Sequence, residues 1–361
     1  MLRPKIKRNI QQIIPFGVIW LLSGWVFLIV ELAASGSFSK LPTTAIKIDF
    51  QIFILSSIAI TSVGLLTGFI ELKYLGNIFT NKNFAIRFIY KFIIYSLLFL
   101  VIVLVTFPIA ASLELNTPLF DKNVWEKYFN YFTSISHLST GVQLATSLVF
   151  SLFYLEIAEF MGHRVLRNFF TGKYHTPIEE ERIFMFLDMK SSTTIAEKLG
   201  HLEYFKLLRT YYDCFTNAII DHEGEIYQYV GDEIILSWSV HKRNNYCIDC
   251  FFAMKEHLKS KENLFKRQFG LVPTFKAGIH FGKVTTGEIG TIKKEIFFSG
   301  DVLNVAARIQ GLCNSYNVDL IVSHDLLEQL ELQAAYDPEF LGMAELRGKE
   351  EKQKLYTVYL K

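Results

Sequence analysis

The first half of the chain is dominated by long apolar stretches separated by short polar segments. The apolar stretches cover residues 12–34, 49–71, 91–113 and 138–160. Each has about 20 residues or more, enough for an α-helix that crosses about 30 Å of hydrocarbon. The first stretch ends in LAASGS, which resembles a signal-peptide cleavage site, but the stretch exceeds the roughly 7–15 apolar residues of such peptides. The pattern therefore predicts that residues 1–162 form four uncleaved membrane-spanning helices.

Lysine and arginine residues predict how these spans are oriented. They gather before the first span, between the second and third, and after the fourth: Arg3, Lys5, Lys7, Arg8; Lys73, Lys82, Arg87, Lys91; Arg164, Arg167, Lys173. The other two loops carry two each: Lys40, Lys47; Lys122, Lys127. Basic residues accumulate on the cytoplasmic side, so both termini are expected in the cytoplasm. We therefore expect a multi-pass protein of the inner (plasma) membrane, with lipid around its spans.

Glu156 and Glu159 lie at the inner end of the fourth span. An ionisable group at this depth is costly unless it reaches water or a partner. The two glutamates could sense or relay a signal, or they could simply reach the membrane interface beside Arg164 and Arg167. The spans offer almost no polar groups at mid-bilayer depth, which argues against a transporter and favours an anchor or a receptor.

The pattern changes in the second half of the chain. From about residue 181, charged residues become frequent and predicted strands alternate with predicted helices. A domain of about 180 residues is within the size of a single core. The segment 163–180 could continue the fourth span as a helix until Pro177 ends it. We therefore expect a linker at 163–180 and a globular domain at 181–361.

Three segments of this domain have clear local patterns. RIFMFLDM at 182–189 has the apolar run of a buried strand, and SSTTIAEKLG then opens a helix. GEIYQYVGDEIILSW at 224–238 has two β-rich runs around a Gly-Asp pair, which predicts a hairpin. FFSGDVLNVAARIQGL at 297–312 predicts a strand, a turn and a helix.

Composition supports a membrane protein with a reduced, cytosolic domain. The chain is 51% hydrophobic and 20% charged, with a mean hydropathy of +0.26. Its net charge of +2 is too small to indicate a nucleic-acid partner. The cysteines all lie in the second half, and their spacing gives no disulfide framework. The pair Cys247 and Cys250 lacks a second pair or a nearby histidine, so we interpret it as packing in a helix rather than as a zinc or redox site.

Asp188 stands where the strand at 182–189 meets the following helix. The first amides of a helix lack intrahelical partners, so a polyphosphate could lie on them while Asp188 holds its metal. Ser191, Ser192 and Thr193 at this helix start could contact the phosphates. They are also ordinary capping residues.

Asp232 lies at the tip of the predicted hairpin. If that tip lies beside the end of the strand at 182–189, Asp188 and Asp232 would repel each other unless cations sat between them. Two aspartates without a nearby histidine or thiolate favour Mg²⁺ or Mn²⁺ over zinc.

Asn304 and Arg308 are four residues apart in the last predicted helix and therefore share one face. They could be solvated there. Aligned toward a phosphate, they would instead stabilise the charge that develops in phosphoryl-type transfer.

The motifs DMKSST, YVGDE, SGDVLNVAAR and LRGK, in this order, resemble the class III nucleotidyl cyclase catalytic domain over residues 181–361. The resemblance implies an α+β ferredoxin-like fold, with helices on one side of a mainly antiparallel sheet. It also implies a head-to-tail homodimer whose active sites form between the subunits. The implied reaction converts ATP to 3′,5′-cyclic AMP and pyrophosphate.

The resemblance also assigns roles to individual residues. Asp188 and Asp232 match the aspartates that bind two metal ions per site, Mg²⁺ or Mn²⁺, with the Met189 carbonyl as an extra ligand. Asn304 and Arg308 match the pair that orients the ribose and stabilises the transition state, and they would come from the partner chain.

The remaining substrate contacts depart from the family pattern or are less certain in register. Lys349 matches a lysine that contacts the terminal phosphates, although other lysines follow it closely. Gln228 and Phe297 occupy the positions that select the purine, and they fit neither the adenine nor the guanine code. ATP is favoured, and the alternatives are a guanylyl cyclase or a catalytically weak nucleotide-binding receptor or scaffold. Ser192 replaces a phenylalanine that is frequent in the family.

Overall fold

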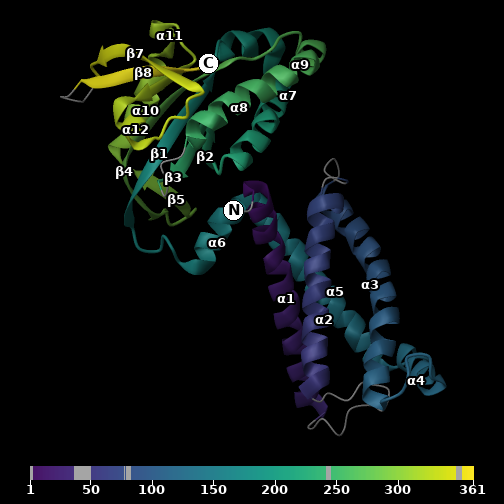
Figure 1. The fold of residues 1–361 in the computed structure, drawn as a ribbon. Helices are drawn as coiled ribbons and strands as arrows, with labels where there is room; N and C mark the ends of the chain where they lie inside the picture. Colours follow the sequence, from purple (N-terminus) through teal and green to yellow (C-terminus); the bar gives the residue numbers. More distant parts are fainter. Residues whose placement is uncertain (1–2, 36–49, 77, 79–82, 241–244, 347–351) are drawn as a thin grey trace. The chain divides into compact units, whose positions relative to one another are not determined.

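The computed structural model of the chain describes residues 3–35, 50–76, 78, 83–240, 245–346 and 352–361. The chain divides into a unit over Ile6–Arg167 and a second unit made mainly of Asn168–Lys361. Figure 1 shows that the first unit is helical and that the second is built on a β-sheet.

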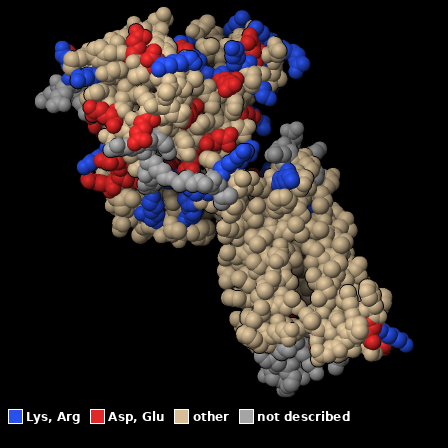
Figure 2. All heavy atoms as spheres, viewed as in Figure 1, with Lys and Arg blue, Asp and Glu red and all other residues tan. Residues whose placement is uncertain are grey.

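Long apolar helices make up the first unit. Among the residues described for this unit, four helices are long and apolar enough to cross a membrane, as the apolar stretches predicted. Many large apolar side chains on these helices are exposed, and Figure 2 shows a surface that is almost free of charged atoms over this unit. The elements of this unit and of the linker are α1 (Pro4–Ser35), α2 (Phe50–Ile70), the π-helical turn η2 (Glu71–Leu75), α3 (Phe84–Leu115), α4 (Lys122–Phe132), α5 (Ile135–Met161) and α6 (His163–Thr171).

The linker differs from the expected continuation of the fourth span. Helix α5 ends at Met161 because Gly162 has a φ of 91°, a value that an α-helix cannot accommodate. A separate helix, α6, follows and ends at Thr171, well before Pro177. The expectation of one helix running through to the proline is therefore wrong.

The interior of the helical unit is closely packed around Trp20. This side chain is fully buried, and its indole Nε1 donates a hydrogen bond to Ser151 Oγ at 3.0 Å. Gly64 on α2 faces it, and a Cβ atom at Gly64 would lie 2.7 Å from the Trp20 ring. Helices α1, α2 and α5 therefore depend on a small residue and a buried hydrogen bond for their close approach.

A buried ion pair lies where α2 passes into its π-helical turn. Glu71 is only 1% exposed and pairs with Lys91 of α3. The Tyr95 hydroxyl donates a second hydrogen bond to Glu71 Oε2 at 2.9 Å. The two buried charges therefore compensate each other, as charges in a membrane-spanning unit must. Lys91 was expected only as one of the basic residues that orient the spans, and Glu71 was not expected to have a role.

Glu156 forms an ion pair within the helical unit. Its Oε2 lies 2.5 Å from the Arg87 guanidinium of α3, so the pair bridges two helices.

The second unit contains an eight-stranded sheet in the order β2-β3-β1-β4-β6-β8-β7, with β5 paired to β4. All the pairings are antiparallel except that of β4 with β6. The strands are β1 (Ile178–Met189), β2 (Glu225–Val230), β3 (Glu233–Ser239), β4 (Phe275–Ile289), β5 (Glu295–Ser299), β6 (Leu320–Ser323), β7 (Tyr336–Ala344) and β8 (Gln353–Leu360).

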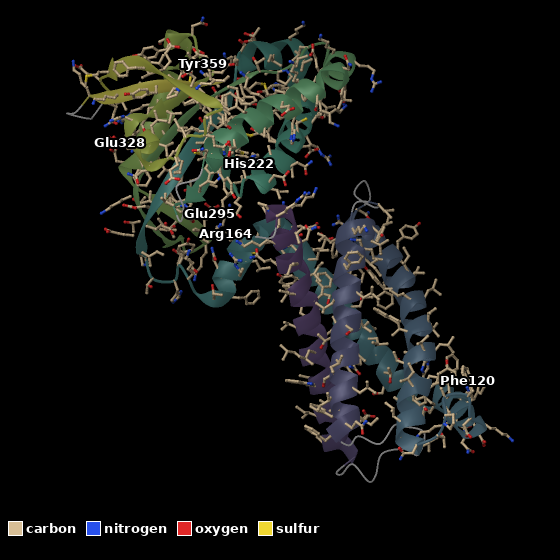
Figure 3. All side chains as sticks on the ribbon, viewed as in Figure 1. Phe120, Arg164, His222, Glu295, Glu328 and Tyr359 are labelled. Carbon is tan, nitrogen blue, oxygen red and sulfur yellow. The ribbon has the colours of Figure 1, made fainter. Side chains whose placement is uncertain are left out.

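Helices cover both faces of this sheet. The helices are α7 (Ser192–Asp221), α8 (Tyr246–Ser260), α9 (Glu262–Phe269), α10 (Asp301–Gly311), α11 (Cys313–Tyr316) and α12 (His324–Gln329). Met185 and Leu187 of β1 pack with α7, α8 and α9, and Figure 3 shows side chains filling this layer. Phe184 and Phe186 face the other way and pack with α10. The mainly antiparallel sheet is confirmed, but the expectation of helices on one side only is wrong because β1 is apolar on both faces.

Helix α10 approaches β4 very closely at Gly278. A Cβ atom there would lie 2.3 Å from the Gln310 backbone nitrogen and 2.7 Å from the Ala306 carbonyl oxygen. Only glycine leaves room for this contact, so Gly278 sets the height of α10 above the sheet. The free cysteines Cys247 and Cys250 are buried in α8, as the packing interpretation predicted.

Candidate active site

Asp188 and Asp232 come together at one end of the sheet. Strand β1 pairs with β3 up to Leu187 opposite Ile234, which brings Asp188 beside the turn between β2 and β3. That turn is tight because Gly231 has a φ of 63°. The two carboxyl groups are close enough to share a hydrogen bond. The predicted meeting of the hairpin tip with the strand end is therefore what the structure shows.

The site concentrates more negative charge than its protein cations balance. Burial, together with the hydrogen bond to Asp232 and its charge, raises the pKa of Asp188 to about 6. Lys276 Nζ at 3.7 Å and the Gln310 side-chain amide, which donates to Asp188 Oδ2 at 3.2 Å, only partly offset this. Burial and the two aspartates also raise the pKa of Glu233 to about 6.

An unsatisfied oxygen indicates what could complete the site. Asp232 Oδ2 is buried and has no hydrogen-bond partner in the described part of the chain. Within those same residues no group of three or more His, Cys, Asp or Glu side chains forms a ready-made metal cluster. A pair of carboxylates with an open oxygen suits Mg²⁺ or Mn²⁺, which commonly take only one or two carboxylates and complete their shell with water and substrate phosphates. The residues present therefore fit a divalent ion.

The predicted phosphate loop directly follows these carboxylates. Met189 buries its side chain in the core, which leaves its backbone carbonyl at the strand end. Ser191 adopts the left-handed conformation, with φ 56° and ψ 31°, and its side chain makes no cap hydrogen bond. Ser192, the first residue of α7, is half-buried, and Thr193 is exposed. Capping by Ser191 is therefore not observed, and an anion can reach the first amides of α7.

The two purine-position residues lie on β2 and β5, strands that are not hydrogen-bonded to each other. Gln228 is exposed on β2, next to a β-bulge at Tyr227, and Phe297 is 44% exposed on β5. Their chain neighbours touch, because the rings of Tyr227 and Phe298 are 4.9 Å apart between centroids. Gln228 therefore follows, and Phe297 precedes, one of the two residues whose rings are in contact.

Asn304 and Arg308 share one face of α10, as predicted. Asn304 is exposed and Arg308 is half-buried. Gln310, which contacts Asp188, lies two residues beyond Arg308 and so about 160° away around the helix axis. Asn304 and Arg308 therefore point away from the aspartates of their own chain. Lys349 lies outside the described residues.

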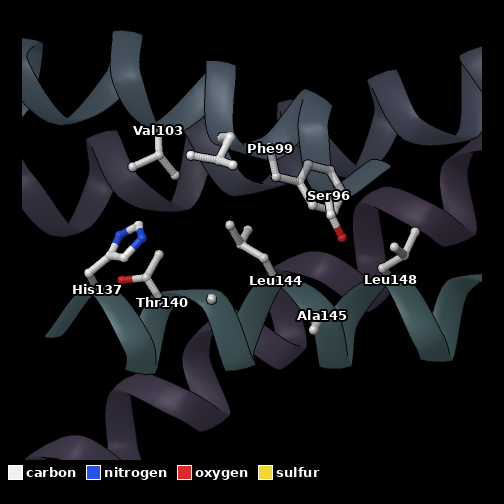
Figure 4. A pocket seen from close by; sticks show the side chains of 10 residues that line it. Ser96, Phe99, Val103, His137, Thr140, Leu144, Ala145 and Leu148 are labelled. Carbon is white, nitrogen blue, oxygen red and sulfur yellow. The ribbon is translucent and has the colours of Figure 1, made fainter. Parts of the chain in front are cut away.

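A separate candidate site lies in the helical unit. Helices α3 and α5 line a cavity of about 140 Å³, shown in Figure 4. The lining is apolar apart from Ser96, Thr140 and His137, whose buried Nδ1 has no partner within the described ranges. The cavity is large enough for a small apolar group, but its lining does not identify a ligand.

Comparison with known proteins identifies the family. A sequence model described as "Adenylate and Guanylate cyclase catalytic domain" matches residues 176–361. This is half of the chain, and with the fold described above it shows that the chain belongs to the family of class III adenylyl and guanylyl cyclases.

Several characterised relatives share this region. "Adenylate cyclase 2" of Rhizobium meliloti (strain 1021) is 32% identical over 203 residues, which cover 56% of this chain and 56% of that protein. "Adenylate cyclase" of Anabaena cylindrica is 26% identical over 48% of this chain and 36% of its own length. "Retinal guanylyl cyclase 2" of Bos taurus is 28% identical over 48% of this chain and 16% of its own length. The chain therefore spans about half or less of the length of these relatives.

A solved structure has the same fold. The structure of a bacterial light-regulated adenylyl cyclase aligns with a TM-score of 0.54 and 22% identity, covering 63% of this chain and 67% of that one.

Proposed function

We propose that the chain is a membrane-bound nucleotidyl cyclase that converts ATP into 3′,5′-cyclic AMP and pyrophosphate at the interface of a homodimer. The observation that carries this proposal is the Asp188 and Asp232 pair with its unsatisfied buried oxygen. A cation-binding carboxylate pair beside the open N-terminus of a helix suits a nucleoside triphosphate and its metal ions.

The direction in which α10 presents its side chains supports a dimer. Asn304 and Arg308 face away from the aspartates of their own chain, so they can serve a site only if a second subunit supplies its aspartates to them. A two-fold arrangement gives each site the metal-binding pair of one chain and the α10 face of the other.

In the proposed reaction, the ribose 3′ oxygen bonds to the α-phosphorus while the bond from that phosphorus to the bridging oxygen of the β-phosphate breaks. Asp188 and Asp232, with the Met189 carbonyl, would hold Mg²⁺ or Mn²⁺, which supplies Lewis-acid activation of the 3′ hydroxyl and charge neutralisation on the phosphates.

The other residues position the substrate. The amides at Ser191, Ser192 and Thr193 bind the phosphates, and Lys349 contacts the terminal ones. Asn304 of the partner subunit orients the ribose. Arg308 of the partner subunit stabilises the negative charge that develops on the phosphoryl group, which its always-charged guanidinium suits.

The rest of the chain anchors this domain. We assign residues 1–162 to a four-span membrane domain, 163–180 to a linker and 181–361 to the catalytic domain. The long apolar helices with exposed apolar side chains support insertion in lipid. The distribution of lysine and arginine supports cytoplasmic termini.

ATP is the proposed substrate because several relatives are named adenylate cyclases. GTP is the second candidate, because Gln228 can donate to or accept from either purine and retinal guanylyl cyclases share the domain.

The direct test is to incubate the purified full-length protein with ATP or GTP and Mn²⁺ and to identify the product by mass spectrometry. Cyclic AMP with an equal amount of pyrophosphate is the expected result. Nucleotide binding without either product would support a receptor or scaffold instead. Cyclic GMP formed from GTP, with no cyclic AMP formed from ATP, would show that GTP is the substrate.

A further inference from the structure

Arg182 is a fully buried arginine in β1, on the same face of the sheet as Asp188. Its guanidinium lies 3.2 Å from Glu180 and 2.9 Å from Glu225, and its side chain is completely buried. It also donates to Ser237 Oγ at 2.8 Å. Such a charge is stable in the interior only because its partners are charged and well placed.

The contacts of Arg182 tie several strands together. Glu225 belongs to β2, Ser237 to β3, and Phe298, whose ring centroid lies 4.8 Å from the guanidinium carbon, to β5. An arginine can do this because its planar fork binds carboxylates at its edge while its face stacks on an aromatic ring.

The strands that Arg182 joins are those that carry the base-position residues. The Phe298 ring under the guanidinium contacts Tyr227 at 4.9 Å. Gln228 follows Tyr227 and Phe297 precedes Phe298 in the chain. A shift of Arg182 would therefore displace the chain segments that carry Gln228 and Phe297 together.

The linker reaches the same network through Glu180. The hydroxyl of Tyr174, a residue only 3% exposed, donates to Glu180 Oε1 at 3.2 Å, and Thr286 of β4 donates to the same oxygen at 2.8 Å. The Tyr174 backbone oxygen also accepts from Glu288 of β4 at 3.1 Å. Burial disfavours the Glu180 carboxylate, but the hydrogen bond from Thr286 and the charge of Arg182 outweigh it and lower its pKa, so it is ionised at neutral pH.

We propose that Arg182 is the positioning residue of the nucleotide-base pocket, and that Tyr174 transmits the position of the linker to it through Glu180. The inference rests on the proposed function of this site. Arg182 lies six residues before Asp188, about 20 Å along the strand. The network therefore acts on base affinity and purine selectivity and leaves the metal pair in place.

The test is Tyr174→Phe in the full-length protein, which removes one hydroxyl and keeps the ring. The expected result is a rise of about three- to tenfold in KM for ATP, with kcat within about twofold of wild type, because a hydrogen bond to a charged group is lost from the pocket support. The ATP to GTP selectivity should shift as well. Tyr336→Phe is the matched control, since it also removes a hydroxyl that bonds to a carboxylate, Asp249, but on the opposite face of the sheet.

A second variant, Arg182→Lys, keeps the positive charge. It loses the planar guanidinium that binds Glu180, Glu225 and Ser237 at once and stacks on the Phe298 ring. It should change KM and purine selectivity in the same direction as Tyr174→Phe. Thermal unfolding of each variant shows whether it is folded, and the comparison uses only those that are.

Binding of a fluorescent ATP analogue gives a readout that does not need turnover. A wild type that binds the analogue but forms no cyclic nucleotide would refute the proposed reaction, while the affinities of Tyr174→Phe and Tyr336→Phe would still decide the inference. Equal affinity, KM and purine selectivity in wild type and Tyr174→Phe would overturn it, as would an equal effect of Tyr336→Phe.

Discussion

Replacing Gly278 by alanine tests whether α10 is held at the height that catalysis needs. The added methyl group would lie 2.3 Å from the Gln310 nitrogen, whereas an ordinary contact needs about 3.4 Å, so α10 must move by roughly 1 Å. The atoms in the way are backbone atoms of α10, which cannot rotate aside as a side chain can.

The expected cost follows from this clash. Overpacking of this kind destabilises by about 1–3 kcal/mol, and about 2–4 °C of Tm is lost per kcal/mol in a domain of this size, so Tm should fall by about 2–12 °C. Asn304 and Arg308 move with α10, and a displacement of about 1 Å in a catalytic group can lower the rate about 100-fold. The assay is cyclic nucleotide formation, with thermal unfolding measured on the same preparation.

Gly282→Ala is the matched control on the same strand. Its new methyl group would meet only the Val302 side chain, at 3.2 Å, which can yield by a few tenths of an ångström. The control should therefore keep most of its activity. Wild-type Tm and activity in Gly278→Ala, or equal losses in both variants, would refute the reasoning.

Three further variants test separate parts of the account. Asp188→Asn removes one of the paired carboxylates, so Mn²⁺ should raise Tm in wild type by several degrees and leave the variant unchanged; a metal-induced shift in the variant would count against this site. Lys91→Met leaves Glu71 as an uncompensated buried charge and should lower the free energy of unfolding by about 3–5 kcal/mol. Adding Glu71→Gln should restore most of this stability, as measured by thermal unfolding. No recovery in the double variant would mean that the two residues are not coupled. The pKa of Glu180 is lowered, so its stabilisation is present above its unfolded pKa and is lost as pH falls through its folded pKa. Glu180→Gln should therefore lose less Tm than wild type between about pH 6 and pH 3, and a parallel loss would contradict this.

Local patterns predicted the parts of the molecule that depend on local order. The length of the apolar stretches predicted the four long helices, because a segment in lipid must form all its backbone hydrogen bonds within one helix. Alternation and a Gly-Asp pair gave the β2–β3 hairpin, and the spacing of Asn304 and Arg308 gave their common face.

Features that depend on distant partners could not be predicted in this way. Arg182 looks like an ordinary charged residue at the start of a strand, and only the register of β1 with β3 brings Ser237 toward it. Glu71 and Lys91 lie in different apolar stretches, so their pairing depends on how α2 and α3 pack. Gln310 and Lys276 were missed at the site because neither belongs to a recognised motif, although both contact Asp188.

The central claim is that each active site combines the aspartates of one subunit with the α10 face of the other. It is tested most directly by mixing Asp188→Ala chains with Arg308→Ala chains, each inactive alone, and measuring cyclic nucleotide formation. Random pairing makes half of the dimers mixed, each with one intact site of two, so roughly a quarter of wild-type activity should return. No activity in mixed dimers that are verified by two different affinity tags would contradict the account.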